Sequence, residues 1–336
     1  MTPAERAAPL DLRSGEMVEV RSAHEILATL DERGALDALP FMPEMLRFCG
    51  RRFQVQQRAD KTCDTITMSG GRRMHGTVHL ADLRCDGRAH GGCQAGCLLF
   101  WKEAWLKRVT EQGDGVEGRS LEPAERERLD RAARSTDAEG ERFTCQATEL
   151  LSASTPLPWW DARQYLRDVL TGNVPARSLL RGAAYAVLDN LRRGRAWLVE
   201  RVLAMGGRVR RRLGLPRVFR GGPTAPATPA EPLDLRPGEM VRVRPREEIL
   251  ATLDRNSRNR GLYYDIEMCR FSGGTYRVLR QVEQIVDEKT GRMMRLRGGC
   301  VVLEGVVCSG ERSFKRRFCP RAIFPYWRQI WLRRVT

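Results

Sequence analysis

The stretch that decides the fold occurs twice: residues 10–31 read LDLRSGEMVEVRSAHEILATLD, and residues 233–254 read LDLRPGEMVRVRPREEILATLD. The two stretches are identical at 17 of 22 positions, with a constant offset of 223 residues. Internal similarity at a fixed offset is the mark of a duplicated structural unit. The chain therefore contains two copies of one domain.

The similarity continues at lower density beyond these stretches. The further matches are 44–55 with 267–278, 77–87 with 300–310, and 100–109 with 326–335. Each copy is thus roughly 100 residues long, an ordinary domain size. We expect a disordered leader over 1–9, followed by a first repeat domain with a Cys/His cluster over 10–110. A basic helical segment over 111–220 and a Pro/Gly linker over 221–232 should come next. The second repeat domain, over 233–336, lacks the histidines and half of the cysteines.

Within each copy, the pattern predicts short strands and one early helix. Residues 15–21, GEMVEVR, alternate apolar and charged side chains, which is typical of a half-buried strand. Ser22 followed by Glu25 is a capping box, so a helix should begin there. Further strands are predicted over 52–57 and 77–83, with a glycine turn between them.

A closing helix is predicted over residues 98–109. It places Trp101 and Trp105 on one face, and indole side chains at this spacing usually belong to a hydrophobic core. Trp327 and Trp331 recur at the equivalent positions of the second copy. Between the copies, helices are predicted over 123–134, 143–152 and 161–170.

A strand that opens with GExVxVR, followed by strands with glycine turns and by a closing helix, resembles the opening of SH3-like barrel modules. The resemblance covers the front part of each copy and implies a fold, not a function. The expected fold class is α+β: two homologous β-rich, SH3-like domains, each with a closing helix, separated by an arginine-rich helical segment.

Length and composition set outer limits on function. The 336 residues are 42% hydrophobic and 30% charged, as in soluble globular proteins. No apolar run reaches roughly 18 residues, so no membrane-spanning helix is expected. The N-terminus shows no secretory signal, which favours a reducing cytoplasm of bacterial type. There, the ten cysteines are expected to be thiols or metal ligands and not disulfides.

The chain is strongly basic, with a net charge of +16, and only five of its 58 basic residues are lysines. Such a field attracts an acidic protein, nucleic acid or an anionic membrane surface, where the protein would be peripheral. Ten arginines and one acidic residue lie within 192–220. The residues predicted to contact the anionic partner are Arg192, Arg193, Arg195, Arg201, Arg208, Arg210, Arg211 and Arg212. Alternatively, an apolar stripe of this segment packs on the repeat domains and its arginines face solvent.

The first copy holds all four histidines and a group of cysteines that suits a metal ion. Cys85, Cys93 and Cys97 share one short glycine-rich stretch with His90, and Cys63 is a candidate ligand from a neighbouring strand or turn. Thiolates and imidazoles bind zinc tetrahedrally, and an iron–sulfur cluster or copper(I) suits similar donors. Zinc is the cofactor expected here.

The second copy tests this interpretation. The matched pairs are Cys85 with Cys308, Cys93 with Cys319, Cys97 with Ile323, and Cys63 with Val286. An equivalent four-ligand site is therefore absent from the second copy. The two shared cysteines also allow a packing or disulfide role.

The favoured function is a metal-binding adaptor that engages an anionic partner through its central basic helices. The first alternative is a cysteine-dependent enzyme in which Cys93, at the start of a helix, is the nucleophile and His90 its base, with a degenerate second copy. The second alternative is a peripheral membrane scaffold. The sequence lacks a P-loop, a GxGxxG after a strand, GxSxG, HExxH and the protein-kinase motifs. No motif therefore identifies an enzyme class, and the sequence leaves open whether the chain is an enzyme.

Overall fold

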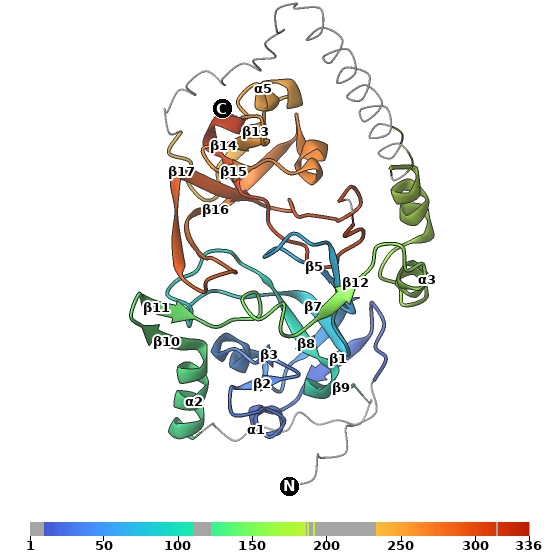
Figure 1. The fold of residues 1–336 in the computed structure, drawn as a ribbon, viewed down its shortest axis with the longest axis vertical. Helices are drawn as coiled ribbons and strands as arrows, with labels where there is room; N and C mark the ends of the chain where they lie inside the picture. The colour runs from blue at the N-terminus through green and yellow to red at the C-terminus, as the bar shows by residue number, and fades with distance from the viewer. Residues whose placement is uncertain are drawn as a thin grey trace, which may run out of the picture.

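The computed structural model describes residues 10–109, 122–185, 187, 191, 233–313 and 315–335. Two β-rich halves lie one above the other, and helices of the intervening stretch lie along their flanks (Figure 1). The fold is mixed α+β, with one main antiparallel sheet in each half. Among the described residues, no helix is long and apolar enough to cross a bilayer.

The N-terminal half is built on a five-stranded antiparallel sheet in the order β8-β7-β4-β1-β9. Its strands are β1 (Met17–Val20), β4 (Arg52–Arg58), β7 (Thr77–Arg84), β8 (Leu98–Lys102) and β9 (Leu106–Arg108). The strands predicted over 15–21, 52–57 and 77–83 are confirmed. Because β1 pairs with both β4 and β9, the beginning and end of this half lie side by side.

The C-terminal half repeats the arrangement in the order β18-β17-β16-β13-β19. Its strands are β13 (Met240–Val243), β16 (Thr275–Val286), β17 (Met293–Leu303), β18 (Trp327–Arg328) and β19 (Leu332–Arg334). The repeated sequence therefore folds twice in the same way. The halves differ in one hairpin. In the first half the chain between β4 and β7 forms two further strands, β5 (Lys61–Cys63) and β6 (Gly71–Arg73), whereas in the second half β16 and β17 are longer.

The predicted closing helix over 98–109 is wrong. β8 leads into η2, a short 3-10 helix (Glu103–Trp105), and then into β9, while η4 (Gln329–Trp331) lies between β18 and β19. All five residues of β8 are buried, so this run lacks the polar face of an amphipathic helix and pairs with β7 instead. Trp101 and Trp105 are fully buried and pack edge-on against Phe41, which confirms their place in the core.

The early helix, α1 (Ala23–Leu27), begins where the capping box predicts it. The Ser22 hydroxyl accepts a hydrogen bond from the Glu25 backbone N–H, and the Glu25 carboxylate accepts one from the Ser22 backbone N–H. In the second half, α5 (Arg246–Leu250) follows Pro245, which supplies no side-chain cap. The remaining short elements are β2 (Ala35–Leu36), β3 (Leu39–Pro40) and η1 (Pro43–Phe48), with counterparts β14 (Arg258–Asn259), β15 (Leu262–Tyr263) and η3 (Ile266–Phe271).

The stretch between the halves mixes helices and strands. The helices predicted over 123–134 and 161–170 are present, but the one over 143–152 is wrong. The buried Arg72 guanidinium donates to the carbonyls of Leu151 (3.0 Å) and Ser154 (2.5 Å), which holds this part of the chain in turns. The elements are α2 (Pro123–Ala133), β10 (Arg134–Asp137), β11 (Gly140–Phe143), β12 (Thr155–Leu157) and α3 (Arg163–Leu170), after which residues 176–185 are helical.

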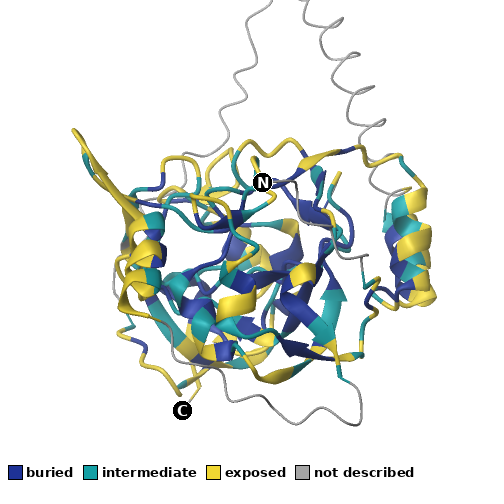
Figure 2. Ribbon diagram, turned by 90° about the horizontal axis from the view of Figure 1, so that it is seen from below, coloured by how far each residue is buried: buried dark blue, intermediate teal, exposed yellow. Residues whose placement is uncertain are grey.

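Each half has its own hydrophobic core with two fully buried tryptophans. The indole N–H of Trp105 donates to the Thr29 hydroxyl (3.1 Å), and that of Trp331 donates to the Thr252 hydroxyl (2.9 Å). Buried residues follow the two sheets, whereas the helices on the flanks are largely exposed (Figure 2). The surroundings of the tryptophans are therefore duplicated, including the hydrogen bond from the indole to a threonine hydroxyl.

The two halves pack against each other through related residues. Thr65 hydrogen-bonds through its hydroxyl to the carboxylate of Glu288, which is its own equivalent at the offset of 223. The buried Arg321 guanidinium donates to both, at 2.8 Å to Thr65 and 3.2 Å to Glu288. Contact between equivalent residues is what a twofold axis produces.

A second pair of contacts supports that symmetry. Cys93 Sγ accepts a hydrogen bond from the backbone N–H of Val286 (3.3 Å). On the other side of the interface, Cys63, the equivalent of Val286, lines one cavity with Cys319, the equivalent of Cys93. Equivalent positions thus meet across the interface in both pairs, which is the pattern that an approximate twofold relation between the halves produces.

Candidate metal centre

A buried carboxylate, Glu44 of η1, holds the cysteine-rich loop of the first half. Its Oε1 accepts a hydrogen bond from the backbone N–H of Ala89 (3.1 Å), and it lies 2.7 Å from His90 Nδ1 and 3.7 Å from Cys85 Sγ. Ligand atoms of Glu44, Cys85 and His90 all lie within 4.8 Å of one another. Donors around a tetrahedral zinc ion are separated by roughly 3.3–3.8 Å, so a small adjustment of these side chains admits an ion.

Both ring nitrogens of His90 face acceptors. Nδ1 faces Glu44, and Nε2 lies 3.2 Å from the Thr144 carbonyl oxygen. A neutral imidazole carries one N–H and satisfies only one of them. Two arrangements solve this: an imidazolium paired with the Glu44 carboxylate, or an Nε2–H donated to Thr144 with Nδ1 bound to a cation. The second is the usual orientation of a metal-bound histidine.

The second half carries the same carboxylate without the histidine. Glu267 Oε1 accepts hydrogen bonds from the Arg312 backbone N–H (2.6 Å) and the Ser313 hydroxyl (3.1 Å), and its Oε2 accepts one from the Ser309 hydroxyl (2.9 Å). Holding the loop is therefore a structural role that both glutamates share. They differ at Oε2, because this buried oxygen of Glu44 has no hydrogen-bond partner in the described part of the chain. A buried carboxylate oxygen without a donor is costly, and a cation would satisfy it.

A cavity of about 40 Å³ adjoins this cluster. That volume admits a water molecule or an ion but not an organic substrate. Four thiols and one imidazole line it, from Cys85, His90, Cys93, Cys97 and Cys145. Sulfur donors that favour soft and borderline metals therefore surround the space beside Glu44.

Burial favours the protonated thiol at Cys85, Cys97 and Cys145 in the absence of a metal. It raises the pKa of Cys85 well above the ordinary value, helped by the charge of Glu44, and raises that of Cys97 to about 12 and that of Cys145 to about 11. Burial also acts to raise the pKa of Glu44, but the hydrogen bond and charge of His90 outweigh it and lower that pKa. A metal must displace the Cys85 proton, so its binding weakens as the pH falls.

The structure separates the five predicted ligands into three places. Cys85 and His90 belong to the cluster with Glu44, Cys93 and Cys97 line the adjoining cavity, and Cys63 faces the second half instead. Sequence reasoning missed Glu44 and Cys145. The available signal for Glu44 was its recurrence, since EMLRF in the first copy matches EMCRF in the second.

Cys93 and His90, the alternative nucleophile and base, line the same cavity. Each has another partner: Cys93 Sγ accepts from the Val286 backbone N–H, and His90 lies between Glu44 and Thr144. Because β8 replaces the predicted helix, Cys93 does not lie at the start of a helix. Activation of this thiol by a helix dipole therefore has no structural basis here.

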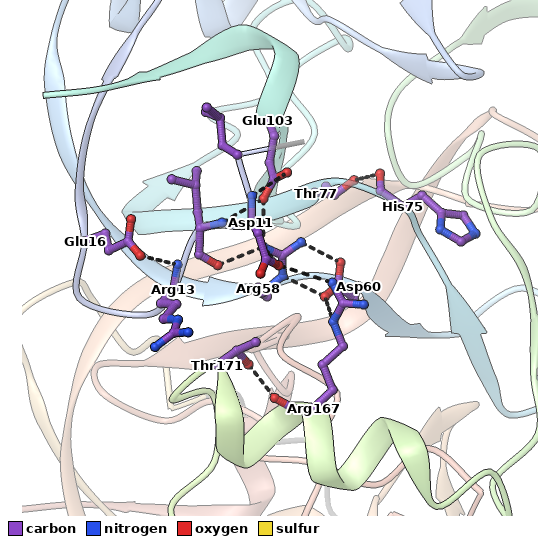
Figure 3. A network of polar contacts seen from close by, with 12 residues as sticks. Asp11, Arg13, Glu16, Arg58, Asp60, His75, Thr77, Glu103, Arg167 and Thr171 are labelled. Carbon is purple, nitrogen blue, oxygen red and sulfur yellow. Dashed lines mark hydrogen bonds and ion pairs between the residues drawn. The ribbon is translucent and has the colours of Figure 1, made fainter. Parts of the chain in front are cut away.

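A second polar network is centred on the buried Arg58 (Figure 3). The Arg58 guanidinium donates to Asp60 (2.7 Å) and to Glu103 (2.7 Å), and Arg167 of α3 reaches the same Asp60 at 2.8 Å. In the second half an uncharged residue, Gln281, stands at the position of Arg58. The network ties α3 to the first sheet, and we interpret it as a structural clamp.

No family model, no curated protein and no solved structure matches this chain. Its function must therefore be argued from its own residues. The eight arginines predicted to contact an anionic partner, together with the predicted leader and linker, lie outside the described residues.

Proposed function

We propose that this protein, built from two SH3-like modules, binds a zinc ion through Glu44, Cys85 and His90. The observation that carries the proposal is the buried Glu44 Oε2, which has no donor among the described residues, whereas both oxygens of Glu267 are satisfied in the same position. A carboxylate, a thiol and an imidazole within 4.8 Å match the donors of zinc sites. An iron–sulfur cluster requires mostly thiolates and suits this mixed set less well.

The fourth ligand in this proposal comes from the cavity beside the cluster, from Cys93, Cys97 or Cys145, or from a water molecule. A cavity of this size has no room for an organic substrate, so the ion has a structural role. It fixes the loop that carries Cys93, whose sulfur contacts Val286 of the second half. Zinc then contributes to the packing of the two halves.

The proposal includes attachment to an anionic membrane surface. Leu166 and Leu170 on α3 and Leu180 on the next helix are 62%, 65% and 73% exposed. In sequence they precede the ten arginines of residues 192–220. Exposed leucines followed by clustered arginines are typical of helices that lie at the headgroup level of a bilayer. Nucleic acid would engage the arginines but leave the leucines without a role.

Elemental analysis tests the zinc part. The chain is purified reduced, without a metal-affinity column, and is expected to contain about one zinc ion. Cys85→Ser should lose the ion, whereas Cys308→Ser, the same change at the related place in the second half, should retain it. Protein without metal, or equal loss in both variants, would contradict the assignment.

Vesicle sedimentation tests the membrane part. At about 0.15 M salt the chain should sediment with anionic vesicles and not with neutral ones. Each inserted leucine contributes about 2 kcal/mol, so Leu170→Ser/Leu180→Ser should weaken binding at least 10-fold. Leu250→Ser, at a 43% exposed leucine of the second half, serves as the control. Equal binding by all three proteins, or preference for nucleic acid over vesicles, would rule out lipid insertion.

A further inference from the structure

Two buried thiols from different halves face each other at the interface. Cys63 ends β5, and Cys319 lies in the loop before β18; they are 5% and 8% exposed. Both residues line the same cavity. From the loop that carries Cys319, Arg321 donates to the Cys63 carbonyl (3.3 Å) and to Thr65 (2.8 Å). The packing of the halves thus brings the two cysteines to one cavity.

We propose that Cys63 and Cys319 form a disulfide when a hydroperoxide oxidises them, and that this bond is a reversible covalent link between the two halves. In the first step, the Cys63 thiolate attacks a peroxide oxygen, the O–O bond breaks, and the sulfur becomes a sulfenic acid as hydroxide leaves and is protonated. In the second step, Cys319 attacks that sulfur, the S–S bond forms and water leaves. The two thiols lose two electrons and two protons, and hydrogen peroxide becomes two water molecules. A thiol reductant reverses the reaction.

The surroundings divide the two roles between the two thiols. The hydrogen bond from Cys319 lowers the pKa of Cys63 to about 6 against the effect of burial, and the charges of Arg321 and Arg316 act in the same direction. Burial raises the pKa of Cys319 well above its ordinary value. We therefore assign the attack on the peroxide to Cys63, whose pKa the neighbouring guanidinium charges act to lower, and the resolution of the sulfenic acid to Cys319.

The oxidant has a route to these sulfurs. A cavity of about 210 Å³ is lined by both cysteines and by Met68, which is 60% exposed. A small peroxide fits this space, whereas a folded thiol oxidoreductase does not. Cys308 lines the same cavity and is the competing partner that the experiment must separate from Cys63.

The related place in the first half supplies an internal comparison. There Cys93 contacts Val286 in place of a second cysteine, so the equivalent disulfide cannot form. Cys63→Val therefore gives position 63 the same residue, valine, that the second half already has at the equivalent position 286. This variant removes the reaction while keeping an apolar side chain of similar size, so we expect it to fold.

Peptide mapping of the full chain tests the proposal. The protein is treated with hydrogen peroxide, its remaining thiols are alkylated, and it is digested with trypsin without reduction. We expect a linked pair of peptides, 62–72 and 318–321, each of which contains a single cysteine. The pair should disappear after treatment with a thiol reductant and in Cys63→Val, and it should persist in Cys308→Ser.

Two results would overturn the proposal. One is a disulfide between Cys308 and Cys319 in place of the expected pair. The other is a free Cys63 thiol after exposed thiols elsewhere have been oxidised. Zinc content is measured on the same samples, and Cys63→Val should retain the ion, so a failure of the disulfide is distinguishable from a failure of the metal site.

Discussion

The comparison of Glu44→Gln with Glu267→Gln gives a sharp test of the metal centre. Both carboxylates hold a loop through a backbone N–H, and glutamine retains an oxygen that can accept that hydrogen bond. The loss of a charged acceptor should cost about 1–3 kcal/mol of unfolding free energy in either half. Only Glu44→Gln also removes a metal ligand. An ion present at a thousand times its dissociation constant stabilises the folded state by about 4 kcal/mol, which this variant should lose as well.

The measurement is urea unfolding of the reduced protein, followed by tryptophan fluorescence, with and without a strong chelator. The chelator should lower the unfolding free energy of the wild-type protein and of Glu267→Gln by the same amount. It should leave Glu44→Gln unchanged. If the wild-type protein ignores the chelator, or if Glu44→Gln loses as much as the others, the Glu44 cluster is an ion pair with His90 and not a metal site.

Three further predictions concern buried polar groups. Burial lowers the pKa of His79 to about 4, so its contribution to stability is complete above the unfolded pKa of about 6.5 and is lost as the pH falls toward 4. Urea titrations in chelator should show this loss, at most about 3 kcal/mol, in the wild-type protein but not in His79→Phe. Thr29→Val removes the acceptor of the buried Trp105 indole N–H and should cost about 1–3 kcal/mol; a cost near zero would mean that water replaces the hydroxyl. Asp168→Leu leaves the buried Lys61 ammonium without its carboxylate partner and should lower the unfolding free energy by about 3–5 kcal/mol. The double variant Lys61→Met/Asp168→Leu should recover most of that stability. A double variant no more stable than the single one would contradict this.

The sequence was sufficient for features that depend on neighbouring residues. The alternation in GEMVEVR predicted β1, and Ser22 with Glu25 predicted the start of α1. The four-residue spacing of Trp101 and Trp105 correctly indicated burial but gave the wrong element. A strand followed by one 3-10 turn also returns two side chains to the same core.

The candidate centre was harder to predict because tertiary structure assembles it. Glu44 and Cys85 are 41 residues apart in the sequence, and only the packing of η1 against the loop that follows β7 brings them together. The position of Cys63 was hard to predict for the same reason. It lines a cavity with Cys319 of the second half, and no local pattern reveals which residues the two halves bring together.

The contact between Thr65 and its own equivalent, Glu288, has a consequence for the origin of this chain. A surface that meets its own copy is the surface of a homodimer, so the architecture implies an ancestral gene whose self-associating product was duplicated and fused. Fusion releases a constraint, because a mutation in a homodimer is present on both sides of the axis, whereas here it is present on one. His90 could thus diverge from Ser313, and Cys63 from Val286, so that equivalent places on one ancestral surface now carry different side chains.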